Sequence, residues 1–343
     1  MSRVLPALAL TAAALALAAC GGGTTPEAAP TQSASGDAGA AFPVTITSAL
    51  GDAVIEAAPE RVVTLGWGAD DIAVSLGVVP VGIETDGWAG DAEGYRPWFR
   101  EAVEAQGAEL PQTIAMYPEL DVDAIVALEP DLVLAPQSGL DQAVFDQLSA
   151  FVPVVAYPEA PWQTSIEDQV EIAAEALGVP EKAAPLLAER QAAIDAAAAD
   201  LATAAGTTFA YVYAGTEPGT LVAYLPGDTR VELLRSLGLE LAPSVQDLQP
   251  DPGTFTTTLG LENADLLNDA DLLFTWFNSA EEQAATEAQP LFAQIPAFAA
   301  GAYVPMLDRP LGMAVSVATP LSVPWALDAY VPLIQGALPG AAG

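Results

Sequence analysis

Short apolar runs alternate with longer amphipathic stretches along this chain, from about residue 61 onward. The runs are rich in Val, Leu and Ile and have the length of single strands, whereas the stretches between them carry apolar residues at helical spacing. Strands are predicted at 61–66, 80–83, 131–135, 154–157, 207–214, 271–276 and 303–306, and helices at 70–76, 95–105, 122–128 and 143–151, with further elements at 231–237, 261–267 and 281–292. This alternation predicts an α/β fold with mainly parallel sheets.

Two parts of the pattern resemble each other. In each half a strand begins with an aspartate, another acid follows ten residues later, and the first helix ends in Ser-Leu-Gly. The aspartates are Asp131 and Asp271, the later acids are Asp141 and Glu281, and the Ser-Leu-Gly segments are 75–77 and 236–238. Because these matches occur in the same order, we expect two similar Rossmann-like α/β lobes, at 43–164 and 206–343.

The segment between these two lobes, residues 165–205, is predicted to be helical. Its second half is rich in alanine and carries Leu187, Ile194 and Leu201 at heptad spacing. Such a narrow apolar stripe stabilises a helix only through tertiary contacts. We therefore expect one long helix that lies against both lobes and bridges them.

The N-terminal segment has the pattern of an export signal. A basic residue, Arg3, precedes an apolar run over 4–17, which is shorter than the ~20 residues needed to span a bilayer. The run leads into Leu-Ala-Ala-Cys at 17–20, which resembles a bacterial lipobox, and Cys20 is the only cysteine. The sequence predicts a lipoprotein signal peptide (1–19), lipidation of Cys20, a flexible linker (20–42) without large apolar residues before its end, and anchoring at the extracytoplasmic face of the cell membrane.

The charge balance narrows the function classes. The chain carries 45 acidic and 9 basic residues, a net charge of -36, and no histidine. Such a charge disfavours nucleic acids and anionic membrane surfaces as partners. Without imidazole there is no Ser-His-Asp or Cys-His catalysis and no histidine-based zinc site. The sequence therefore indicates a protein that is not an enzyme. The alternative is a carboxylate-based anchored hydrolase, but with 45 acids a pair somewhere is inevitable and is no evidence for it, and no motif places two acids against one cleft.

Aromatic and basic side chains follow several predicted strands, where ligands bind in open α/β sheets. The candidates for ligand contact are Trp67, Trp88, Tyr117, Gln137, Tyr213, Tyr224, Arg230, Trp276 and Arg309, together with Ser138, Tyr157 and Asn278. Other aromatic and basic residues have simpler expectations: Trp98, Trp162 and Trp325 in core packing, Arg61 near a strand start, Arg96 and Arg100 on a solvated helix face, and Arg190 in the bridging helix.

Three segments carry a resemblance to a known family: 58–66 (APERVVTLG), 76–82 (LGVVPVG) and 127–135 (ALEPDLVLA). With the lipobox and the linker, they resemble the substrate-binding lipoproteins of iron-siderophore ABC importers. The resemblance implies two α/β lobes joined by one long helix, with a ferric siderophore between them. It implies a monomer without a cofactor, and no protein ligand to the metal, because the siderophore already saturates the iron.

The resemblance also implies an ABC transporter permease as partner. Acidic residues on the two lobes of such proteins are understood to dock onto permease arginines, and the resemblance suggests Asp141, Glu281 and Glu282 for that role. The alternative cargoes are cobalamin, haem or a free metal. Haem usually takes an axial His, Tyr, Met or Cys and free zinc or manganese favours histidine, so the absence of histidine disfavours these two, and cobalamin stays open.

Overall fold

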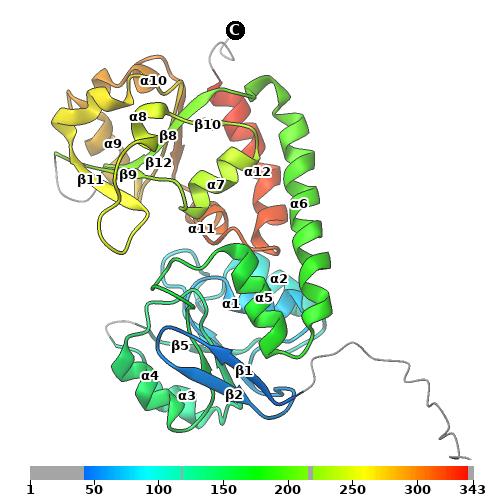
Figure 1. Cartoon of the computed structure of the whole chain (residues 1–343). Helices are drawn as coiled ribbons and strands as arrows, with labels where there is room; N and C mark the ends of the chain where they lie inside the picture. Colours follow the sequence, from blue (N-terminus) through cyan, green and yellow to red (C-terminus); the bar gives the residue numbers. More distant parts are fainter. Residues whose placement is uncertain (1–41, 117–118, 215–218, 339–343) are drawn as a thin grey trace, which may run out of the picture. The chain divides into compact units, whose positions relative to one another are not determined.

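The computed structural model describes residues 42–116, 119–214 and 219–338 (Figure 1). The predictions for the signal peptide, Cys20 and Tyr117 lie outside these residues. A two-stranded antiparallel hairpin, β1 (Val44–Thr47) and β2 (Asp52–Ile55), comes first and was not among the predicted elements. No helix within the described ranges is both long and apolar enough to cross a membrane.

The first sheet forms the centre of lobe one, the name used here for residues 43–164. Its five strands are all parallel and lie in the order β5-β4-β3-β6-β7. The strands are β3 (Val62–Thr64), β4 (Gly82–Glu84), β5 (Gln112–Ile114), β6 (Leu132–Leu134) and β7 (Val154–Val155), and the helices are α1 (Ala69–Ser75), α2 (Pro97–Ala105), α3 (Val122–Ala127) and α4 (Gln142–Ser149). β3 and β6 are buried at every position, as expected for central strands covered on both faces.

The second sheet forms the centre of lobe two, residues 206–338. Its strands are β8 (Thr208–Tyr213), β9 (Thr220–Tyr224), β10 (Glu240–Leu241), β11 (Thr256–Gly260), β12 (Leu272–Trp276) and β13 (Tyr303–Met306). The order is β11-β9-β8-β12-β13, with β10 also paired to β8. β9 and β11 run antiparallel, so this sheet is mixed. The connection from β8 to β9 is too short for the crossover of a dozen or more residues that parallel pairing requires.

The helices of lobe two differ from the prediction in several places. They are α7 (Thr229–Ser236), α8 (Pro243–Gln246), α9 (Ala280–Glu287), α10 (Pro296–Ala299), α11 (Arg309–Val317) and α12 (Ser322–Ala337). The element predicted at 281–292 ends at Glu287, shortly before Pro290, and a short 3₁₀ helix follows at Phe292–Gln294. Residues 261–267 form a 3₁₀ helix. Four helices, α8, α10, α11 and α12, have no counterpart among the predicted elements.

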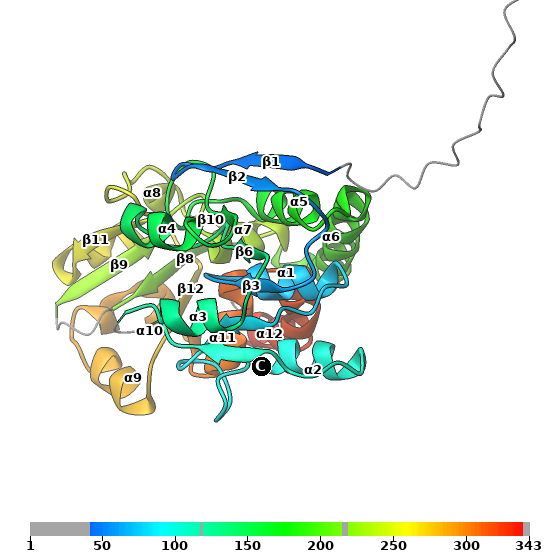
Figure 2. The same cartoon turned by 90° about the horizontal axis from the view of Figure 1, so that it is seen from below.

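The bridging segment forms two helices, α5 (Ile166–Ala176) and α6 (Ala183–Asp200), separated by Gly178 at a positive φ and by a 3₁₀ turn at Pro180–Lys182. α6 packs on α12 of lobe two and on α5, which in turn packs on α1 of lobe one (Figures 1 and 2). Leu187 packs with the apolar core of lobe one, whereas Ile194 and Leu201 are fully buried in the core of lobe two. The α/β fold with two lobes and one bridging helix is confirmed.

Direct contacts also join the two lobes, which belong to one compact unit. Trp98 of α2 is buried with its ring centroid 5.2 Å from that of Trp325 in α12, so both pack in the core as predicted. Beside this pair, the Thr319 hydroxyl donates to the buried carboxylate of Asp71 in α1 at 2.8 Å. The two lobes therefore meet through apolar packing and one buried hydrogen bond.

Candidate ligand-binding site

A cavity of about 420 Å³, here called the central cavity, lies between the strand ends of the two sheets. Residues from both lobes line it: Gly66, Trp67, Glu84, Thr85, Asp86, Gly87, Trp88 and Arg96 from lobe one, and Arg230, Trp276, Asn278, Gly312, Met313 and Ser316 from lobe two. Most of them directly follow β3, β4 and β12. The cavity therefore occupies the position where ligands bind in open α/β sheets.

A second and larger cavity of about 730 Å³, here called the side cavity, shares Trp67 and Arg230 with the central one. Its walls come from the segment 162–167, from α6, and from 227–232 and 253–256 of lobe two. Gln137, Arg190 and Gln191 are among its polar lining residues. The two cavities are thus neighbours with a common boundary of one aromatic ring and one guanidinium.

The aromatic wall of the central cavity is fixed by stacking and by indole hydrogen bonds. Trp276 stacks on Tyr213 with ring centroids 4.1 Å apart and planes 6° apart, and its Nε1 donates to the Tyr224 hydroxyl at 2.9 Å. Trp88 meets Trp276 edge-on at 5.6 Å, and its own Nε1 donates across the lobes to Asn278 at 2.9 Å. The rings therefore present preset faces to a ligand.

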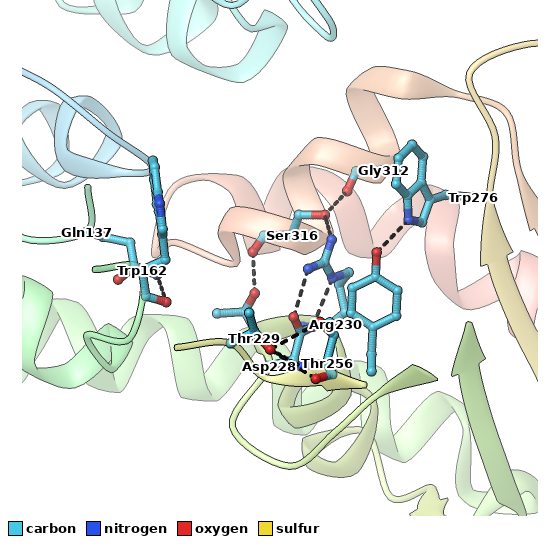
Figure 3. Close-up of polar contacts among 11 residues, drawn as sticks. Gln137, Trp162, Asp228, Thr229, Arg230, Thr256, Trp276, Gly312 and Ser316 are labelled. Carbon is cyan, nitrogen blue, oxygen red and sulfur yellow. Dashed lines mark hydrogen bonds and ion pairs between the residues drawn. The ribbon is translucent and has the colours of Figure 1, made fainter. Parts of the chain in front are cut away.

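Arg230 provides the cation of lobe two. It lies in the first turn of α7, whose N-cap Asp228 binds the guanidinium in a two-pronged ion pair at 2.7 and 2.9 Å. The guanidinium also lies 4.2 Å from the ring centroid of Tyr224 and makes a long hydrogen bond of 3.4 Å to the Ser316 hydroxyl. Figure 3 shows the guanidinium between Ser316 and Asp228. Burial alone would lower the pKa of Arg230, but the Asp228 carboxylate raises it above the ordinary value. The charge is permanent, and N–H groups remain for a ligand.

Arg96 is the corresponding cation of lobe one, and its predicted place on a solvated helix face is wrong. Arg96 is buried, pairs with Asp70 at 2.5 Å and lines the central cavity. Because Pro97 opens α2, Arg96 is the N-cap in an extended conformation, which takes its side chain off the helix face. The Arg-Pro pair, together with two buried acids on the preceding helix, is the sequence signal that could have indicated this.

Two carboxyl groups near the cavity have pKa values close to neutral. Burial raises the pKa of Glu84 to about 7, while its carboxylate accepts the Gly66 N–H at 3.0 Å. Burial likewise raises the pKa of Asp71 to about 7, although Trp98 and Thr319 both donate to it at 2.8 Å. Both acids therefore keep a proton more readily than ordinary carboxyl groups, and only Glu84 of the two lines the central cavity.

The positions of Trp67, which lines both cavities, and of Gln137, which lines the side cavity, depend on a glycine. Gly66 has a φ of 81°, and a Cβ there would lie 2.3 Å from the Gln137 carbonyl oxygen, which accepts the Trp67 N–H at 2.9 Å. The Gln137 amide donates to the Trp162 carbonyl at 3.1 Å and accepts the Thr164 N–H at 2.9 Å. Gln137 thus holds the 162–164 loop, with most of its hydrogen-bonding capacity used inside the protein.

Trp162 was predicted in core packing, and the structure contradicts this. Its side chain is 37% exposed and lines the side cavity, and its ring centroid lies 5.7 Å from that of Trp67. The residue has a φ of 61°, and its indole packs over Gly139, so the ring projects from the loop instead of entering the core. Trp162 is therefore a further candidate for ligand contact.

Several residues that were predicted to contact the ligand do not line either cavity. Arg309 donates to the Asn278 carbonyl and lies 5.9 Å from the Trp88 ring centroid, and it is not among the lining residues of either cavity. Tyr213 and Tyr224 hold Trp276 as described above. Ser138 and Tyr157 make buried hydrogen bonds to backbone carbonyls within lobe one.

The remaining arginines outside the cavities are where they were expected. Arg61 is exposed and donates to the carbonyls at the end of α3, and Arg100 pairs with Asp91 and Glu93 at the surface of α2. The described residues hold no group of three or more acidic or cysteine side chains that could bind a metal ion.

The three acids predicted to dock a permease differ in their surroundings. Asp141 is the exposed N-cap of α4, and Glu281 is exposed in the first turn of α9. Glu282 is partly buried instead: one oxygen accepts the Tyr213 hydroxyl at 2.8 Å, and the other accepts the Asn278 N–H at 2.9 Å. Its carboxylate is therefore used within the lobe to position the cavity wall.

Known proteins resemble this chain in sequence and in structure. A cobalamin-binding protein of Halobacterium salinarum is 33% identical over 167 residues, which are 48% of this chain and 41% of that protein, so the match spans about two fifths of the relative. PiaA of Streptococcus pneumoniae TIGR4, solved in complex with ferrichrome, has a TM-score of 0.79 and 28% identity over 85% of this chain and 98% of its own. A periplasmic solute binding protein from Mycobacterium smegmatis has a TM-score of 0.72 and 27% identity over 85% and 97%.

The sequence model of the family described as periplasmic binding protein matches residues 62–304. This range includes the first sheet, the second sheet except the end of β13, the bridging helix, and eleven of the fourteen residues that line the central cavity. The chain belongs to the periplasmic binding protein family.

Proposed function

We propose that this chain captures a ferric siderophore between its two lobes and delivers it to an ABC importer. The observation that carries the proposal is the central cavity, which combines three indole rings with one guanidinium from each lobe. A ferric siderophore has its iron enclosed by its own oxygen donors and presents an apolar shell with partly anionic oxygens. Aromatic faces and arginine donors suit such a surface, and no protein ligand to the metal is needed.

The similarity to PiaA, which is solved with ferrichrome, supports this cargo, because the match extends over 98% of that chain. Cobalamin is the second candidate, since the Halobacterium relative is described as a cobalamin-binding protein. That match extends over less than half of either protein. The siderophore is therefore the first ligand to test, with cobalamin as the comparison.

We propose that the protein is located at the extracytoplasmic face of the cell membrane, anchored through lipid on Cys20. We propose that it is a monomer both with and without ligand. Membership of a solute-binding family supports binding without catalysis. For permease docking we propose Asp141 and Glu281, because both are exposed at the start of a helix that follows a parallel strand of its sheet. Exposed acids of this kind contribute more to orientation and encounter rate than to affinity.

Titration of the purified chain with ferrichrome, followed by tryptophan emission, tests the proposal. We expect saturable quenching, because Trp67, Trp88 and Trp276 line the cavity, and a much weaker effect with ferric salt alone. Saturable binding of free ferric ion without a siderophore would contradict the proposal, and tighter binding of cyanocobalamin would favour the second candidate.

A matched pair of variants locates the binding. Arg230→Lys keeps a cation beside Asp228 but loses the planar fork, so affinity should fall about tenfold or more. Arg235→Lys, on the same helix but outside both cavities, should leave affinity unchanged. Equal affinities in the two variants would move the site away from Arg230.

A further inference from the structure

We propose that Arg190 forms an anion subsite in the side cavity, which binds a carboxylate carried on the periphery of the siderophore. The inference rests on the proposed function and specifies its ligand class: a ferric chelate whose iron centre occupies the central cavity and whose acidic arm reaches past Trp67 and Arg230. Four observations lead to it, namely the position of Arg190, its lack of an acidic partner, the occupied acids around it, and the room beside it.

Arg190 lies on the bridging helix α6 and lines the side cavity. Its Nε donates to the carbonyl oxygen of Ala318, at the end of α11 in lobe two, at 2.9 Å. The two terminal amino groups make no hydrogen bond to any of the described residues. A guanidinium that lines a cavity, is held through its Nε and keeps its terminal amino groups without a partner among the described residues is suited to bind a planar carboxylate.

Arg190 also lacks an ion pair, unlike Arg96 and Arg230, the other two arginines that line the cavities. Arg96 pairs with Asp70 and Arg230 with Asp228, whereas no carboxylate of the described residues lies within 4.0 Å of Arg190. Burial lowers the pKa of Arg190, and the negative charge of Glu167 opposes this shift. A partly buried cation without an ion pair is unfavourable, so an anionic ligand group gains from pairing with it.

Acids that line the side cavity are already engaged, with one exception. Asp228 is neutralised by Arg230, and Glu232 accepts the Gly227 N–H at 3.0 Å and pairs with Arg235. Glu167 is the exception, because it is exposed and has no ion pair among the described residues. The nearest uncompensated positive charge for an anion that enters this cavity is therefore Arg190.

The sizes of the cavities fit an extended ligand. The side cavity, at about 730 Å³, is larger than the central one, at about 420 Å³, and the two share Trp67 and Arg230. The lining of the side cavity includes the hydroxyl groups of Thr254 and Thr256 and the amide of Gln191. These groups can hydrogen-bond a polar arm of the ligand.

The test uses two probes with the same neutral ferric trihydroxamate centre, one with a free carboxylate on a flexible arm and one with a primary amide in its place. The unaltered chain should bind the carboxylate probe about tenfold more tightly or better. Arg190→Gln should remove this preference while leaving the affinity for the amide probe nearly unchanged, and Arg190→Lys should keep part of it. Arg61→Gln, at an exposed arginine outside both cavities, serves as the control and should keep the preference in full.

A purely structural role of Arg190, through its bond to Ala318, would weaken both probes to the same extent in Arg190→Gln. That result would overturn the subsite. Equal affinities of the two probes for the unaltered chain would also overturn it, as would a preference for the carboxylate probe that survives Arg190→Gln. Each of these outcomes leaves the proposed function in place. Binding of neither probe by the unaltered chain, together with no binding of ferrichrome, would overturn the proposed function itself and the subsite with it.

Discussion

Replacement of Arg230 by methionine should destabilise the fold as well as weaken ligand binding. The Arg230 and Asp228 side chains are 13% and 9% exposed, and their charged atoms lie 2.7 Å apart. Removing one partner of such a buried pair typically costs about 3–5 kcal/mol, because the other charge is left desolvated. Asp228 keeps one backbone donor, since it also accepts the N–H of residue 230 at 3.0 Å, so we expect a loss near the lower end, about 3 kcal/mol.

A second substitution separates the two effects. Asp228→Asn removes the unpaired charge and still provides an oxygen that can cap α7, because Asn and Asp are similarly good N-caps. The double variant Asp228→Asn with Arg230→Met should therefore recover most of the lost stability, to within about 1 kcal/mol of the unaltered chain. It should not recover ligand affinity, because a charge-assisted contact of about 1.5–3 kcal/mol is still missing.

Urea unfolding followed by far-ultraviolet circular dichroism gives the stabilities, and tryptophan quenching gives the affinities. The reasoning would be refuted if Arg230→Met alone were as stable as the unaltered chain, or if Asp228→Asn failed to rescue it. Recovery of ferrichrome affinity in the double variant would show that Arg230 acts only through the fold.

Three further predictions follow from the described contacts. The pKa of Glu84 is raised from 4.5 to about 7, so the folded state binds the proton more tightly than the unfolded chain, and the free energy of unfolding should fall as the pH rises between these values. Glu84→Gln should remove this part of the pH dependence. Melting temperatures of the variant that depend on pH in the same way as those of the unaltered chain would contradict the prediction. Thr319→Val should cost about 1–2 kcal/mol in urea unfolding by removing a donor to buried Asp71, Thr319→Ser should restore it, and equal stability of the two variants would refute the role of the hydroxyl. Asp141→Arg combined with Glu281→Arg should leave ferrichrome affinity within about twofold but abolish uptake in cells, with Asp141→Asn as a control that keeps the helix cap; normal uptake by the reversed variant would place docking elsewhere.

Most of the fold could be predicted where burial fixes a periodic pattern. The central strands of lobe one are buried on both faces, so they appear in the sequence as uninterrupted apolar runs. The antiparallel β9 and β11 alternate buried and partly exposed positions weakly and lie next to a short connection, so neither was recognised. α12 was also missed, because it is apolar over much of its circumference and contains Pro332.

The candidate site could be predicted only in part, because strand ends indicate where a side chain begins but not where it points. Trp67, Trp88 and Trp276 line the central cavity as the topology suggested. Arg96 and Trp162 were assigned to a helix face and to the core because the local pattern contains neither the N-cap geometry nor the positive φ that directs them. Contacts between the lobes join residues far apart in the sequence and leave no periodic signal.

The most direct test of the account is the position of the iron in crystals grown with a ferric siderophore, measured from anomalous scattering at the iron edge. We predict one strong peak in the central cavity, between Arg96 and Arg230 and close to the Trp276 ring, with no protein side chain as a metal ligand. An iron peak on the outer surface bound by carboxylates, or a siderophore bound outside the space between the two lobes, would contradict the account.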